Sequence, residues 1–246
     1  MMDELLKKMK DFSRFLELED NIPYWESLMP ELEDRIEELN WNKQQKELEM
    51  LQLKEPNFFQ RLFGRAEEKK ELLSKQIREI TAARTAAQWE LEDLKKKLQE
   101  GKQELETLAD SQKAYKDAMT DSMLTPGQES CLLMEQITAF APLALETAWR
   151  ALTALEDARP WIRSNRVMMD GSRKMELLYR AQDYSRRLLK ILAALPEGAV
   201  DPCARLENLY DYICGATSEY KQQDRLENVQ IELRTLRNQL KLLLGE

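Results

Sequence analysis

The chain has 246 residues, of which 43% are hydrophobic and 33% are charged, and its formal net charge is −8. This composition is typical of a folded chain of one or two domains, and the acidic balance argues against general nucleic-acid binding. Only 7 glycines and 8 prolines are present, too few for the many turns of a β-rich fold. The sequence therefore predicts an all-α fold.

Histidine is absent, which excludes imidazole-based catalytic triads, two-His zinc sites and the Glu-x-x-His pairs of di-iron bundles. Cys131, Cys203 and Cys214 form no Cys-x-x-Cys pair, and we interpret them as reduced, buried structural thiols. No glycine-rich phosphate-binding loop occurs. We expect a protein that is not an enzyme, with no catalytic, cofactor-binding or metal-binding residue and no small-molecule substrate.

No segment reaches the run of about 18 to 20 apolar residues that spans a membrane. The first residues, Met1-Met2-Asp3-Glu4, lack the basic and apolar regions of a signal peptide. These features favour a cytoplasmic location.

Residues 1–20 are predicted to form an amphipathic N-terminal helix. Leu5, Met9, Phe12 and Leu16 recur at helical spacing and give it one apolar stripe. Asn21-Ile22-Pro23 is expected to break the helix.

Residues 21–124 are predicted to form a coiled-coil hairpin with a long central helix. Positions spaced alternately four and three residues apart from Phe59 to Met119 carry mainly apolar side chains, the pattern of a coiled-coil seam. The seam comprises Phe59, Phe63, Ala66, Lys70, Leu73, Ile77, Ile80, Arg84, Ala87, Leu91, Leu94, Leu98, Gly101, Leu105, Leu108, Gln112, Tyr115 and Met119. A helix of this length needs partner helices, and the outer part of the seam favours a homodimer.

Residues 125–200 are predicted to form a small helical-bundle head. Thr125-Pro126-Gly127-Gln128 is a helix start signal, with Thr125 at the N-cap, Pro126 in the first turn and Gln128 completing a capping box. The helix that follows has an apolar face too wide for a two-stranded seam.

Residues 201–246 are predicted to form a C-terminal helix that returns along the stalk, which is then partly three-helical. Short links imply antiparallel neighbours, which places Leu226 near Leu98 and Leu32 near Ile80. The third helix would also cover Trp89.

One basic segment stands out from the acidic background, and its arginines can bind phosphate or carboxylate in a bidentate manner. It comprises Arg159, Arg163, Arg166, Arg173, Lys174, Arg180, Arg186, Arg187 and Lys190. Two interpretations are open: the cations pair with acidic side chains of the same chain, or they dock an acidic protein, a phospholipid surface or a nucleic acid.

The leading functional hypothesis is a non-enzymatic coiled-coil scaffold or adaptor that mediates protein–protein interaction. A short amphipathic helix followed by a helical hairpin resembles the layout of the phage-shock and vesicle-inducing membrane-remodelling family. This resemblance of layout implies, as the alternative, a peripheral membrane protein. The third hypothesis is binding of an acidic or nucleic-acid partner through residues 159–190.

Overall fold

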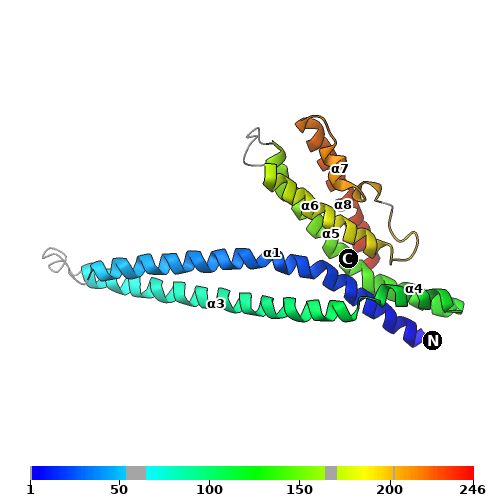
Figure 1. Cartoon of the computed structure of the whole chain (residues 1–246), viewed down its shortest axis with the longest axis horizontal. Helices are drawn as coiled ribbons and strands as arrows, with labels where there is room; N and C mark the ends of the chain where they lie inside the picture. Colours follow the sequence, from blue (N-terminus) through cyan, green and yellow to red (C-terminus); the bar gives the residue numbers. More distant parts are fainter. Residues whose placement is uncertain (1, 54–64, 164–170, 202) are drawn as a thin grey trace. The chain divides into compact units, whose positions relative to one another are not determined.

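The computed structural model describes residues 2–53, 65–163, 171–201 and 203–246, and all of its regular elements are helices. The prediction of an all-α fold is confirmed. In chain order the helices are α1 (Met2–Gln52), α3 (Arg65–Thr107), α4 (Ser111–Asp121), α5 (Pro126–Arg163), α6 (Gly171–Leu192), the short 3₁₀ helix η1 (Ala204–Leu206), α7 (Leu209–Cys214) and α8 (Glu219–Leu244) (Figure 1).

The chain divides into two compact units, of which the first combines residues 1–20 with residues 105–246 and the second is residues 21–104. The sequence had placed residues 105–124 with the hairpin and residues 1–20 by themselves. In the structure both of these segments belong to the first unit, because Phe12 of α1 stacks on Tyr115 of α4 with ring centroids 5.7 Å apart.

The core of the first unit is built from several helices. The predicted stripe of α1 is buried in it, since Leu5, Met9, Phe12 and Leu16 each expose 3% or less of their surface. Phe140 of α5 is fully buried in the same cluster, 5.7 Å from Phe12 between ring centroids. The N-terminal helix is thus an integral part of this core.

The start of α5 agrees with the predicted capping box. The helix begins at Pro126, the backbone N–H of Thr125 donates to Gln128 Oε1 at 3.0 Å, and the N–H of Glu129 donates to the Thr125 carbonyl at 2.9 Å. The local sequence signal at Thr125 to Gln128 therefore predicted this helix boundary correctly.

The C-terminal segment differs from its prediction. It is not one helix but η1, α7 and α8, and the apolar stripe of α8 is buried in the core of the first unit. The neighbour that covers the stripe is α5, as the ion pairs Arg159–Glu227 and Arg234–Glu156 show. The prediction that this helix covers the long central helix is wrong, because α5 offers α8 a wider apolar face.

Two helix boundaries were also predicted incorrectly. α1 continues through Pro23 and Pro30 instead of ending near Asn21. The long helix is interrupted after Thr107, where the N–H of Leu108 donates to the Leu105 carbonyl at 3.2 Å and that of Ser111 to the Leu108 carbonyl at 2.9 Å. These i to i−3 bonds form a tight turn before α4.

The second unit is an antiparallel pair formed by residues 21–52 of α1 and residues 65–104 of α3 (Figure 1). Its register differs from the prediction, because Glu33 pairs with Lys95 at 3.3 Å and Glu26 pairs with Lys102 at 2.6 Å. Leu32 therefore lies beside Leu94 rather than Ile80, a shift of about four helical turns. The prediction had assumed a short link between the two helices, and the linking residues 54–64 lie outside the described ranges.

The packing of α8 gives a direct test of the first unit. Leu233→Ala should lower the free energy of unfolding by about 2 to 5 kcal/mol, because Leu233 is fully buried and its removal leaves a cavity against α5. Urea titration followed by circular dichroism measures this change. Leu242→Ala is the matched control on the same helix, since Leu242 is 76% exposed. Equal effects of the two substitutions would contradict the packing described here.

Candidate interaction surfaces

The described part of the hairpin has a narrow core. Its buried hydrophobic side chains are Ile22, Leu73, Ala87 and Leu94. The predicted seam positions from Leu73 to Gly101 are all buried or half-buried, so α3 does turn its seam inward. Two helices cannot enclose a side chain from every side, and much of the apolar surface along the hairpin therefore stays open.

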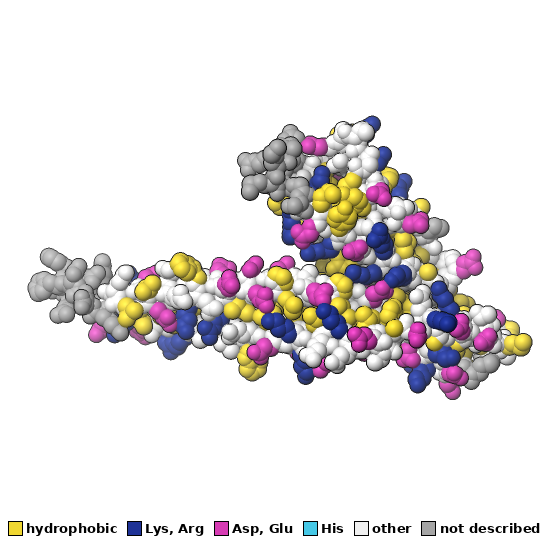
Figure 2. All heavy atoms as spheres, viewed as in Figure 1, with side chains coloured by type: hydrophobic (Ala, Val, Ile, Leu, Met, Phe, Trp, Pro, Cys, Tyr) yellow, Lys and Arg dark blue, Asp and Glu magenta, His cyan; other side chains and the backbone are white. Residues whose placement is uncertain are grey.

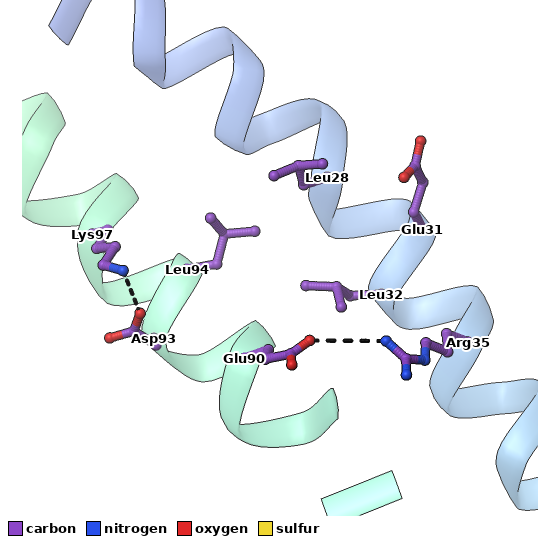
Figure 3. Close-up of a pocket in the computed structure, with 8 residues that line it drawn as sticks. All are labelled: Leu28, Glu31, Leu32, Arg35, Glu90, Asp93, Leu94 and Lys97. Carbon is purple, nitrogen blue, oxygen red and sulfur yellow. Dashed lines mark ion pairs between the residues drawn. The ribbon is translucent and has the colours of Figure 1, made fainter. Parts of the chain in front are cut away.

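An apolar groove of about 500 Å³ runs between the two helices of the hairpin. Leu28 and Leu32 of α1 point toward Leu94 of α3 and form its floor (Figure 3). Figure 2 shows hydrophobic side chains along this part of the molecule, flanked by charges of both signs. The groove has the form that an amphipathic helix requires for docking.

Charged side chains form the two rims of this groove. Glu31 and Arg35 belong to α1, and Glu90, Asp93 and Lys97 belong to α3. Arg35 pairs with Glu90 across the groove at 4.0 Å, and Lys97 pairs with Asp93 at 2.6 Å along α3 (Figure 3). These side chains are more than half exposed, so the pairs add little stability and can exchange partners.

A polar layer interrupts the apolar seam of the hairpin. Arg84 occupies a seam position and donates from Nη1 to Asn40 Oδ1 at 3.1 Å, while its Nε is buried without a hydrogen-bond partner among the described residues. A polar side chain in such a position stabilises one register over its neighbours and lowers overall stability.

Two tryptophans lie on the outside of the hairpin. Trp41 is 61% exposed and Trp89 is 73% exposed. The expectation that a third helix covers Trp89 is therefore wrong, because α8 packs in the first unit.

The basic segment is largely paired within the chain. Of the predicted basic segment, the Arg163 side chain and the whole of Arg166 lie outside what the structure describes. The pairs are Arg159–Glu227, Arg173–Glu176, Arg180–Glu176, Arg186–Asp183, Arg187–Asp20 and Lys190–Glu19. Lys174 is half-buried near Cys214. Burial raises the pKa of the Cys214 thiol, and the hydrogen bond with Tyr210 and the charge of Lys174 offset part of this rise. The docking role of the segment stays a prediction, carried by the exposed pairs on α6.

A buried charge cluster joins α1, α5 and α6 inside the first unit. Arg150 Nη1 donates to Asp20 Oδ2 at 2.7 Å and to the Asp20 carbonyl at 3.1 Å, and both side chains are 7% exposed. Thr147 Oγ1 lies 3.1 Å from the same Oδ2, and Arg187 Nη1 lies 3.7 Å from Oδ1. The cluster anchors the end of the N-terminal segment of α1 to the other helices of its unit.

The pKa of the Asp20 carboxyl reflects opposing effects, of which burial and the charge of Arg150 are the largest. Burial, the larger one, raises this pKa above its ordinary value, and the positive charge of Arg150 lowers it. Sequence reasoning missed this cluster. The available signal was Arg150 itself, a single charge on the apolar face that includes Ala144, Ala148 and Ala151.

The cysteines occupy three different environments. Cys203 is buried, and burial raises the pKa of its thiol to about 11. Cys214 is half-buried, whereas Cys131 is exposed. The interpretation of all three as buried thiols is therefore wrong for Cys131, which lies in the exposed first turns of α5.

The described residues contain neither a candidate metal site nor a candidate membrane span. Within the ranges given above, no three His, Cys, Asp or Glu side chains are grouped so that they could hold a metal ion. Among the described helices, none combines the length and the apolar character needed to span a membrane.

Comparison of the chain with protein-family models, with curated proteins and with solved structures gave no match.

The buried charge cluster predicts a strong effect of removing one partner. Asp20→Ala should destabilise the protein by about 3 to 5 kcal/mol, because it removes the buried carboxylate from Arg150 and leaves it paired with the half-exposed Glu146, 3.2 Å from Nε. Urea unfolding measures the loss. Asp183→Ala, which breaks the exposed pair with Arg186, should cost about 1 kcal/mol or less. If Asp20→Ala does not fold, Asp20→Leu combined with Arg150→Met should restore folding, and failure to do so would contradict an ion-pair role.

Substitution in the polar layer of the hairpin should stabilise the protein, in contrast to the substitution of Asp20. Arg84→Leu should raise the free energy of unfolding by about 1 kcal/mol, because it replaces an incompletely bonded polar group in the seam with an apolar one. Thermal unfolding followed by circular dichroism measures the change. Arg78→Leu, at an exposed position of α3, should stay within about 0.5 kcal/mol of the wild type. A destabilised Arg84→Leu variant would show that Arg84 supports the seam.

Proposed function

We propose that this chain is a non-enzymatic helical scaffold or adaptor that binds a protein partner along the groove of its hairpin. The observation that carries the proposal is the apolar floor between charged rims, formed by the half-buried Leu28 and Leu32 against the buried Leu94. Buried Leu side chains supply affinity in helix-in-groove recognition, and charged rims supply specificity.

The energetics of the hairpin support this proposal. A long two-helix unit with few buried hydrophobic side chains gains stability when a further helix covers its open side. A ligand that binds only the folded form stabilises it by mass action. Partner binding and the folding of the hairpin are then coupled.

The alternative hypotheses rest on other surfaces. An acidic protein partner could be held by Arg173, Arg180 and Arg186, whose exposed ion pairs within α6 are weak enough to exchange. A membrane role for the N-terminal helix would require its apolar stripe to leave the core of the first unit, where Met9 and Phe12 are buried.

Site-specific photo-crosslinking tests the scaffold proposal. A benzophenone amino acid in place of Glu31, on the groove rim, should crosslink to a defined protein in the source cells. The same residue in place of Gln44 should not, because Gln44 is exposed and lies about 140° away around α1.

Binding by the purified components completes this test. The crosslinked protein should bind the wild-type chain, and Leu28→Glu should weaken that binding at least about tenfold by placing a charge at a half-buried position of the apolar floor. Equal crosslinking from both positions, or none from either, would count against the groove. Turnover of a defined substrate, lost on substitution of particular side chains, would refute the non-enzymatic proposal.

A further inference from the structure

On each rim of the hairpin groove an acid precedes a base along the helix. A copy of the rim placed by a two-fold rotation therefore presents a base opposite the acid and an acid opposite the base. On α1 the acid Glu31 precedes the base Arg35, and on α3 the acid Glu90 precedes the base Lys97. In an antiparallel contact of a helix with its own copy, each such acid meets the base of the other copy. Both rims have this property for these two pairs. Asp93, at the centre of the α3 rim, would lie opposite its own copy, and Lys97 of the same helix pairs with it at 2.6 Å.

The two rims also share one centre. The midpoint of Glu31 and Arg35 is Glu33, and the midpoint of Glu90 and Lys97 falls between Asp93 and Leu94. Glu33 Oε1 lies 3.3 Å from Lys95 Nζ, so the two midpoints lie at nearly the same level along the hairpin. A single two-fold axis perpendicular to the helices therefore satisfies both rims at once.

The apolar floor lies on this same axis. Leu32 and Leu94 are next to the two midpoints, and Leu28 lies one turn away (Figure 3). A second copy placed by the rotation would bring its own Leu32 and Leu94 close to the same two side chains, and four helices would enclose Leu32, which two leave half-buried.

We propose that the occupant of the groove is a second copy of this chain, and that two hairpins associate antiparallel about an axis through Glu33 and Leu94. This proposal rests on the proposed function, because it names the partner of the same groove. The leucines supply the apolar contact, and the pairs Glu31–Arg35 and Glu90–Lys97, each formed between copies, determine the register.

The geometry leads to a complementary pair of variants. Glu31→Arg makes the α1 rim wholly basic, and Arg35→Glu makes it wholly acidic. Each variant alone places like charges opposite one another in the dimer. A mixture of the two variants places the two basic side chains of one rim opposite the two acidic side chains of the other, so that every contact on this rim is attractive.

Sedimentation equilibrium and native mass spectrometry test this scheme on the whole chain, whose mass is 28.9 kDa. The wild type should form a dimer at tens of micromolar, each single variant should dimerise at least about tenfold more weakly, and the mixture of variants should form the heterodimer. The Arg35–Glu90 pair lies within one copy, so mixing the two variants cannot restore it. Formation of the heterodimer therefore reports on contacts between copies. Circular dichroism should show equal helix content in both variants.

Other outcomes overturn the inference. A wild-type chain that stays monomeric removes it, and so does a dimer whose single variants and mixture all behave like the wild type. A groove that crosslinks from position 31 to a different protein, in a chain that stays monomeric, leaves the scaffold proposal standing and refutes self-association. If no protein crosslinks to the groove from position 31, both the scaffold proposal and self-association are refuted.

Discussion

Two helices in contact cover only one side of each other, and this constraint governs the whole hairpin. The first unit avoids it by packing α1, α5, α6 and α8 around a shared core, so that residues such as Phe140 and Leu233 are completely enclosed. In the described part of the second unit the helices are α1 and α3 alone, and the seam between them is closed only in part. The open groove follows directly from the number of helices, without any special side chain.

Local periodicity was the reliable part of the sequence signal. The stripe from Leu5 to Leu16, the inward seam from Leu73 to Gly101 and the capping box at Thr125 depend only on neighbours within a turn or two, and the structure contains all three. The partner of α8 was not predictable in this way. The apolar stripe of α8 has the same spacing whichever helix covers it. Its partner is α5 because α5 has the wide apolar face.

The breaks in the long helices show a second limit of prediction from local sequence. Asn21-Ile22-Pro23 suggested a boundary, yet α1 passes through Pro23 and Pro30, whereas the turn at Leu108 to Asp110 contains neither Gly nor Pro. That turn coincides with the change from the two-helix seam to the many-helix core, close to the unit boundary after Glu104. Tertiary packing, which no local pattern records, overrides propensity here. The pairing of charges is equally nonlocal, since Asp20 and Arg150 are far apart in the chain.

The polar layer and the charged rims have complementary physical roles. Apolar contacts alone would let one helix slide along the other by a turn at little cost, and the groove rims would then lose their alignment. The Arg84–Asn40 bond disfavours such a slip, because a shifted register would separate the two groups. A hairpin that gives up some stability to hold its register presents Glu31, Arg35, Glu90 and Lys97 in constant positions. Specific recognition by exposed charges requires that constancy, because each pair is weak and only their fixed arrangement discriminates between partners.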